Sequence, residues 1–153
     1  MVPTVDTIRY EYFMSAWLDN QHPLLFVGPV GGGKSCMVKQ HLKQRNETIF
    51  CAALSASTSS RGLQDLLESR LEKRTKVSNS FVSSPNDLNF QGTFGPAGGR
   101  RLIVFLDDFN MPMEDNYGSQ PPLELIRQWL GYGFWYDRQK QWKRLIKVCY
   151  YLC

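Results

Sequence analysis

The feature that most constrains this 153-residue chain is a glycine-rich octapeptide between a short apolar run and a helical pattern. It matches the phosphate-loop pattern G-x-x-x-x-G-K-[ST] and consists of Gly28, Pro29, Val30, Gly31, Gly32, Gly33, Lys34 and Ser35. Backbone amides can curl round phosphate oxygens only where no Cβ blocks the approach or forbids a positive φ, which accounts for the glycines. The lysine then places its charge on the outer phosphates, the serine hydroxyl can coordinate Mg²⁺, and the next helix presents its positive N-terminal end. We therefore expect these eight residues to bind a nucleotide.

A second motif ends the longest apolar run of the chain. Leu102–Leu106 is followed directly by Asp107 and Asp108. An apolar strand that ends in two acids resembles a Walker B element, in which Asp107 would hold Mg²⁺ through water, beside Ser35, and Asp108 would polarise the attacking water as the catalytic residue. Either motif alone has a plain structural explanation, a tight strand-to-helix turn or an acidic turn. Together they predict a Mg-nucleotide site.

The order of the remaining patterns predicts the fold class. Apolar runs indicate buried strands at Leu24–Val27, Ile49–Leu54, Leu102–Leu106 and Leu145–Leu152. Helical spacing predicts four helices. The first is capped by Thr4, and the second runs from Lys34 to about Arg45 and buries Met37, Val38, His41 and Leu42. The third is capped by Ser59 or Ser60 and has Leu63, Leu66, Leu67 and Leu71 on one face, and the fourth starts at Pro121–Pro122 with an apolar stripe of Leu123, Ile126, Trp129 and Leu130. Alternating strands and helices indicate an α/β domain with a parallel sheet.

One stretch does not fit the alternation. Val77–Gly99 contains a single charged residue, Asp87, among many Ser, Asn, Gly and Pro residues. We expect a flexible insert there, within one domain that covers residues 1–153.

Composition narrows the class of protein. Hydrophobic residues make up 42% of the chain and charged residues 21%, which is typical of a globular domain. A membrane span needs about 20 apolar residues, and Leu102–Leu106 has five. Arg138–Cys153 carries five basic residues and no acidic one, but such a stretch is more often a solvated face or a subunit contact than a nucleic-acid site. Neither a membrane nor nucleic acid is therefore an expected partner.

The cysteines and aromatic residues have ordinary explanations. Four cysteines and two histidines show no zinc-binding spacing and are expected to be reduced thiols and plain side chains. Cys36 follows the phosphate loop, where a helix N-terminus can activate a thiol, but a packing role is the simpler interpretation. The aromatic cluster is expected to be core or interface rather than a base-stacking platform; its members are Trp129, Phe134, Trp135 and Tyr136.

Several segments resemble the AAA+ ring of dynein heavy chains, most closely the third AAA+ module in its axonemal form. The segments that carry the resemblance are Val2–Thr7, Gly28–Ser35, Glu68–Arg70, Glu72–Lys76, Asp107–Pro112, Tyr117–Arg127 and Tyr132–Arg138. Between them they span nearly the whole chain apart from Val77–Gly99 and the last few residues. The resemblance implies a P-loop NTPase fold, namely the large AAA+ subdomain with a parallel sheet flanked by helices. The chain would stop at the fourth strand, which in such modules lies between the phosphate-loop strand and the Walker B strand.

The resemblance also implies a function. The cofactors would be ATP or ADP with Mg²⁺, and the chain would contribute to or gate an ATP-driven microtubule motor of cilia or flagella. Its partners would be the neighbouring AAA+ modules of the same heavy chain and, through the intact motor, other dynein subunits and microtubules. The location would be the cytoplasmic cytoskeleton, in the axoneme.

Two other functions stay open from the sequence. The first is a structural or regulatory module that holds a nucleotide without hydrolysing it, and the second is a small stand-alone P-loop NTPase or kinase. Asp108 stands where most AAA+ modules carry glutamate, and an arginine finger is not found in the chain. We therefore expect hydrolysis within the intact motor and almost none from the isolated chain.

Overall fold

The computed structural model describes residues 2–74, 93–96, 101–137, 142–146 and 148–153. The described residues fall into two compact units. Unit 1 contains those of Met1–Ser55, Arg100–Met111 and Val148–Cys153, and unit 2 those of Ala56–Gly99 and Pro112–Lys147. Among the described residues, no helix has the length and apolar character needed to cross a membrane.

Unit 1 is an α/β unit with a parallel sheet. Its elements are α1 (Val5–Asp19), β1 (Leu24–Leu25), α2 (Lys34–Lys43), β2 (Thr48–Ala53), β5 (Leu102–Asp107) and β8 (Cys149–Leu152). The four strands lie in the order β1-β8-β5-β2, and every adjacent pair is parallel. The predicted fold class is confirmed, and the fourth strand of the sheet, β8, lies between β1 and β5 as the resemblance implied.

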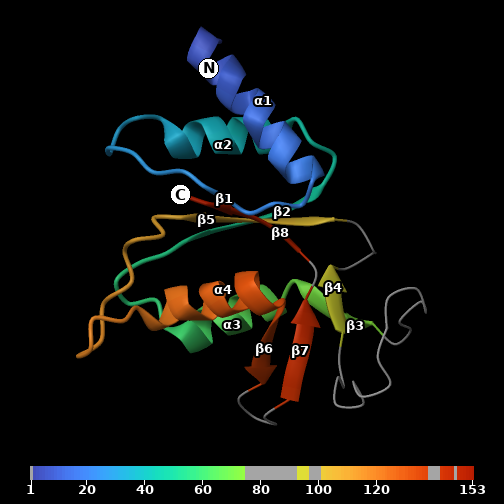
Figure 1. The fold of residues 1–153 in the computed structure, drawn as a ribbon, viewed down its shortest axis with the longest axis vertical. Coiled ribbons are helices and arrows are strands. Elements are labelled where there is room, and N and C mark those ends of the chain that lie inside the picture. Colours follow the sequence, from blue (N-terminus) through green and yellow to red (C-terminus); the bar gives the residue numbers. More distant parts are fainter. Residues whose placement is uncertain (1, 75–92, 97–100, 138–141, 147) are drawn as a thin grey trace. The chain divides into compact units, whose positions relative to one another are not determined.

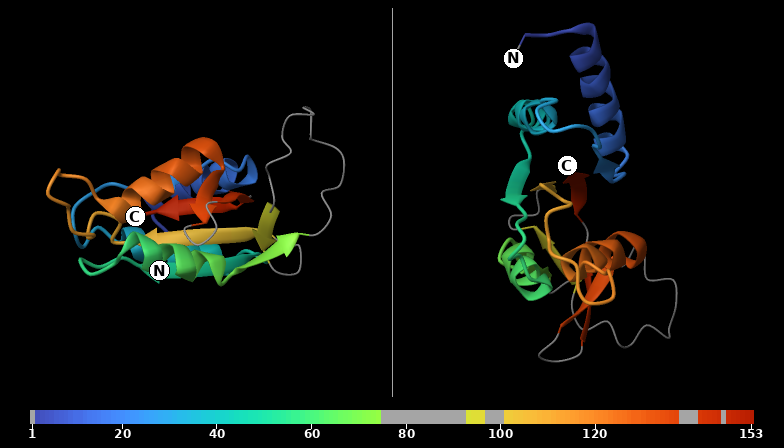
Figure 2. Two further views of the ribbon diagram at one scale, coloured as in Figure 1. Left: turned by 90° about the horizontal axis from the view of Figure 1, so that it is seen from below. Right: turned by 90° about the vertical axis from the view of Figure 1, so that its left-hand side faces the viewer.

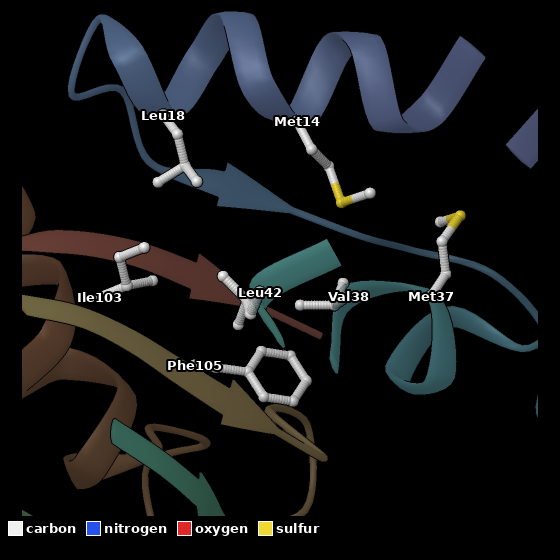
Figure 3. Packing of buried hydrophobic residues seen from close by; sticks show 7 residues of the cluster. All are labelled: Met14, Leu18, Met37, Val38, Leu42, Ile103 and Phe105. Atoms are coloured by element: carbon white, nitrogen blue, oxygen red, sulfur yellow. The ribbon is translucent and has the colours of Figure 1, made fainter. Parts of the chain in front are cut away.

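The core of unit 1 lies between the sheet and its two helices. Met14 and Leu18 of α1 and three residues of α2 pack against alternate residues of β5 (Figure 3). The cluster consists of Met14, Leu18, Met37, Val38, Leu42, Ile103 and Phe105. β5 is buried along Leu102–Leu106, as the sequence predicted.

Local sequence fixes where the two helices of unit 1 begin. The Thr4 hydroxyl accepts a hydrogen bond from the Thr7 amide, and the Thr7 hydroxyl accepts one from the Thr4 amide, which makes a reciprocal cap for α1. The second helix begins at Lys34, directly after Gly33, and buries the four residues predicted for it, His41 among them.

The prediction that the first two strands are buried on both faces is wrong. β1 covers only Leu24–Leu25 of the predicted Leu24–Val27, and Val27 is 85% exposed. β2 alternates in burial, and Phe50 is its one buried residue. Both strands form the ends of the described sheet order. An end strand has a neighbour on one side only, so an apolar run is not by itself enough to place it in the interior.

Unit 2 combines two helices with a second sheet. Its elements are α3 (Ser60–Glu68), β3 (Leu71–Arg74), β4 (Thr93–Pro96), α4 (Pro121–Tyr132), β6 (Phe134–Asp137) and β7 (Trp142–Ile146). The sheet order is β3-β4-β7-β6, with antiparallel outer pairs and a parallel central pair. This second sheet was not predicted from the sequence.

The two helices of unit 2 pack around a tryptophan pair. Trp129 of α4 and Trp135 of β6 are both at most 1% exposed and meet edge to face, with ring centroids 4.8 Å apart. The indole N–H of Trp135 donates to Glu68 Oε1 of α3 at 3.0 Å. The aromatic cluster therefore includes core residues, as predicted.

Three boundaries in unit 2 differ from prediction. Leu71 lies in β3 rather than on the third helix, because that helix ends at Glu68 and Ser69 caps it. The single strand expected over Leu145–Leu152 is two strands, since Leu145 pairs with Phe134 in the β6–β7 hairpin and a separate strand begins at Cys149. Most of Val77–Gly99 lies outside the described residues, but Thr93–Pro96 within it forms β4.

Candidate nucleotide-binding site

The predicted phosphate loop connects β1 to α2 within unit 1 (Figure 1). Two of its glycines have left-handed backbones, Gly31 with φ +84° and Gly33 with φ +75°. A Cβ built on either would meet no atom within 4 Å. The conformation of the backbone, rather than lack of space, therefore demands glycine at these positions. The open space around both α-carbons is the kind of cradle that phosphate oxygens need.

The loop lysine is folded back onto its own loop. Lys34 Nζ donates to the carbonyl oxygen of Gly28 at 2.8 Å and to that of Pro29 at 2.9 Å. These two bonds hold the ammonium group against the first two residues of the loop. A bound phosphate would offer the same ammonium stronger, charged acceptors.

The two sequence motifs meet at one hydrogen bond. Ser35 Oγ, in the first turn of α2, donates to Asp107 Oδ1, the last residue of β5, at 2.6 Å. Seventy-two positions separate the two residues in sequence. The structure thus brings together the two side chains that were predicted to share a metal ion.

The second oxygen of the same carboxylate has a cationic partner. Lys39 Nζ lies 3.0 Å from Asp107 Oδ2. Burial by itself would raise the pKa of Asp107, but the hydrogen bonds from Ser35 and Lys39 outweigh it and the pKa is lowered. The hydrogen bond to Asp107 in turn raises the pKa of Lys39. Asp107 is therefore an anion at neutral pH, as a metal ligand must be.

Asp108 differs from its neighbour in exposure and backbone. It lies at the surface with φ +55°, a left-handed conformation that non-glycine residues adopt infrequently, asparagine, aspartate and histidine more often than the rest. Its carbonyl oxygen accepts a hydrogen bond from the Met111 amide at 3.0 Å, which closes a turn after β5. Because this turn immediately follows Asp107, the predicted catalytic carboxylate lies at the same end of β5 as the predicted metal ligand.

Sequence reasoning missed two residues at this site. Lys39 follows Ser35 by four positions, so both lie on one face of α2, and that spacing could have shown it. Cys153 directly follows β8, and its amide donates a hydrogen bond to the carbonyl oxygen of Leu106 at 2.9 Å, next to Asp107. Burial, followed by the charge of Asp107, raises the pKa of the Cys153 thiol, so that thiol stays protonated at neutral pH. Cys36, by contrast, is exposed.

The residues present fit a magnesium-bound nucleotide. Mg²⁺ is usually held by one or two protein oxygens plus substrate phosphates and water, rather than by an all-protein cage. Within the described part of the chain, no group of three or more His, Cys, Asp or Glu residues could hold a metal unaided. A hydroxyl and a carboxylate beside an open loop is the donor set that leaves the remaining positions to phosphate.

Comparison with known proteins identifies the family. Residues 1–153 match the family described as "P-loop containing dynein motor region". The chain belongs to this dynein motor family. Dynein axonemal heavy chain 2 of Homo sapiens is 47% identical over 150 residues, which are 96% of this chain and 3% of that protein. Dynein axonemal heavy chain 12 of Rattus norvegicus is 43% identical over 141 residues, 90% of this chain and 4% of that protein.

A third similar protein is also a dynein axonemal heavy chain. Dynein axonemal heavy chain 3 of Homo sapiens is 39% identical over 142 residues, 91% of this chain and 3% of that protein. The chain therefore spans only a few per cent of the length of these relatives. A P-loop-containing motor region is a nucleotide-binding module in general terms, which agrees with the loop, Ser35 and Asp107 described above.

Proposed function

We propose that the chain is a Mg-ATP-binding AAA+ module of an axonemal dynein heavy chain, corresponding to the third module of the motor ring. The observation that carries the proposal is the 2.6 Å hydrogen bond between Ser35 and Asp107, because it joins the two motifs into one site. The family match over the whole chain supports the assignment to dynein. The long segments that resemble the third module support the choice within the ring.

Each residue of the site has a distinct task in this proposal. The amides of Gly28–Gly33 and the ammonium group of Lys34 bind the phosphates, and the N-terminal end of α2 adds a favourable dipole. Ser35 and Asp107 hold Mg²⁺, which would neutralise the charge of the bound phosphates. Asp108 orients and polarises water at the end of β5. Since phosphoryl transfer depends on positioning and charge stabilisation, these tasks account for most of what a single module can contribute.

The proposal extends to the whole motor. The module would bind and slowly hydrolyse ATP and so gate a microtubule motor in the axoneme of cilia or flagella. Its partners would be the neighbouring AAA+ modules and, through the intact heavy chain, other dynein subunits and microtubules. An arginine finger supplied in trans is worth 10³ or more in related enzymes, so we expect the isolated chain to bind nucleotide and hardly turn it over.

Thermal unfolding with and without Mg-ATP tests the binding. Ligand at about 100 times its dissociation constant should stabilise the wild-type chain by roughly 2.7 kcal/mol, a rise in Tm of about 5–10 °C. Lys34→Ala should abolish the rise. Lys43→Ala is the matched control, because Lys43 is an exposed lysine on the same helix. A cooperative transition that Mg-ATP does not shift in the wild type would contradict the proposal.

The conformation of Asp108 favours a second candidate, a nucleotide-bound module that does not hydrolyse. The exposed, left-handed Asp108 carries a shorter side chain than the glutamate usual at this position. In that case Asp108→Asn would leave ATP turnover of the assembled motor unchanged. Loss of turnover with retained nucleotide binding would favour hydrolysis instead.

A further inference from the structure

Among the described residues, Lys39 forms an ion pair with Asp107, the carboxylate to which the proposed function assigns Mg²⁺. Its ammonium group lies 3.0 Å from Asp107 Oδ2 and 5.7 Å from the centroid of the Phe105 ring. The two contacted residues, Phe105 and Asp107, lie two positions apart on β5, so the Lys39 side chain extends from α2 along that strand. Neither the phosphate-loop pattern nor the Walker B pattern includes this position.

The Lys39–Asp107 contact places an ammonium group close to the position that a Mg²⁺ ion would need. Asp107 offers two oxygens, and Ser35 and Lys39 engage one each. If the Ser35 hydroxyl coordinated Mg²⁺ and Asp107 held it through water, Lys39 in its present place would face a divalent cation across a single carboxylate. Like charges so close repel each other, and the carboxylate would have to divide its charge between them.

We propose that Lys39 is the counter-ion of Asp107 in the metal-free site, a positioning residue that keeps the carboxylate beside Ser35 and weakens Mg²⁺ binding by competing with it. This inference rests on the proposed function. The side chain of Asp107 is 15% exposed and that of Lys39 is 50% exposed. The Asp107 carboxylate is thus largely enclosed, whereas the flexible side chain of Lys39 can swing away into solvent. The raised pKa of Lys39 agrees with a charged, paired ammonium group.

The exposure of Lys39 sets the expected size of the effect. A pair with one partner half in solvent is worth less than a buried one, and exposed pairs typically contribute a few tenths to one kcal/mol. Hydrogen bonds between charged groups reach somewhat more. We therefore expect removal of the Lys39 charge to tighten Mg²⁺-dependent binding by about three- to tenfold.

The experiment compares nucleotide affinity with and without metal. A fluorescent ATP analogue is titrated into the full 153-residue chain, once in EDTA and once in saturating Mg²⁺, for the wild type and three variants. Lys39→Gln removes the charge, and Lys39→Arg keeps it. Lys43→Gln removes a charge of the same sign from an exposed position one turn farther along α2.

The inference predicts a specific pattern of dissociation constants. In Mg²⁺, Lys39→Gln should bind the analogue three- to tenfold more tightly than the wild type, whereas in EDTA the two should agree within about twofold. Lys39→Arg and Lys43→Gln should follow the wild type in both conditions. A merely structural role for Lys39 would change both conditions together.

Three results would overturn the inference and leave the proposed function standing. The first is an affinity of Lys39→Gln in Mg²⁺ that equals or falls below that of the wild type. The second is weaker binding of Lys39→Gln in EDTA, which would make Lys39 a phosphate ligand. The third is an equal gain in affinity in Lys43→Gln, which would be a general effect of charge. A wild-type chain that binds no nucleotide in either condition, with Lys34→Ala indistinguishable from it, would refute the proposed function and this inference together.

Discussion

The left-handed glycines of the phosphate loop allow a test of the loop conformation that needs no ligand. Gly31→Ala and Gly33→Ala each add one methyl group, which would meet no atom within 4 Å. Neither substitution creates a clash or removes a hydrogen bond of a side chain. Any change in stability must therefore come from the backbone, which has φ +84° at Gly31 and φ +75° at Gly33.

The expected magnitude follows from two opposing terms. Holding an L-residue in the left-handed region costs about 1–2 kcal/mol. Replacing glycine also restricts the unfolded chain, which returns about 0.4–1 kcal/mol. The net result is a destabilisation of about 1 kcal/mol for each variant, or a fall in Tm of roughly 2–4 °C for a chain of this size.

Gly28→Ala is the matched control, because it lies in the same loop and unit without a positive φ. Its new Cβ would lie 3.7 Å from Lys34 Cδ, an ordinary van der Waals contact. The only remaining effect is that alanine restricts the unfolded chain more than glycine does, so this variant should be as stable as the wild type or slightly more stable. The two left-handed positions should therefore fall below Gly28→Ala by about 1–2 kcal/mol.

Urea unfolding followed by circular dichroism, in buffer without nucleotide, measures the three free energies. The reasoning predicts an order rather than a single value, with Gly28→Ala at or above the wild type and the other two variants below it. Equal stability of all three alanine variants would show that the loop does not hold this backbone conformation in solution without a ligand. The geometry inferred for phosphate binding would then be wrong.

Three further predictions concern stability. Thr4→Ala removes the reciprocal cap of α1 and should cost about 1 kcal/mol in thermal unfolding, whereas Thr4→Ser should retain most of it. Trp135→Ala should cost about 3–5 kcal/mol in urea, because the side chain is fully buried; Trp135→Phe should cost much less, and equal costs would contradict the packing described. The pKa of His41 is lowered below the usual 6.5, chiefly by burial and also by the nearby charge of Arg45. The unfolded chain therefore binds a proton at His41 more readily than the folded chain does, and the free energy of unfolding should fall as the pH drops from 6.5. His41→Leu should flatten that fall between pH 7 and pH 5, and an unchanged pH profile would refute this assignment.

The site was predictable from sequence wherever backbone conformation is encoded locally. The glycine pattern located the loop, and the acids at the end of an apolar run located Asp107, because parallel strands bring their carboxyl ends to one edge of a sheet. Lys39 was not predicted, since a lysine on an exposed helix face ordinarily points to water. The spacing from Ser35 places Lys39 on the same face of α2, but its contact with Asp107 depends on α2 packing against β5.

The fold of unit 1 followed from the sequence better than that of unit 2. The central strand β5 is apolar without interruption and is buried as expected. The sheet of unit 2 pairs short segments with little apolar periodicity, such as Leu71–Arg74 with Thr93–Pro96. Such pairing depends on partners far apart in sequence, which local propensity does not specify. Leu145 likewise pairs with Thr93 of β4, a partner remote in sequence that the apolar run over Leu145–Leu152 does not indicate.

The position of β8 also sets an order of events during folding. In the described sheet, the strand that leads into the phosphate loop pairs with β8 alone, Leu24 with Tyr151 and Leu25 with Leu152. On its other side, β8 pairs with β5 through Cys149–Leu152. More than a hundred residues of chain therefore separate the loop strand from the strand that anchors it, and closing so long a loop is slow. As the chain leaves the ribosome, α1, α2 and the loop emerge early, yet the loop strand gains its neighbour only after residue 152 has emerged. If nucleotide binding requires the paired loop strand, binding would report, during synthesis, that β8 has inserted.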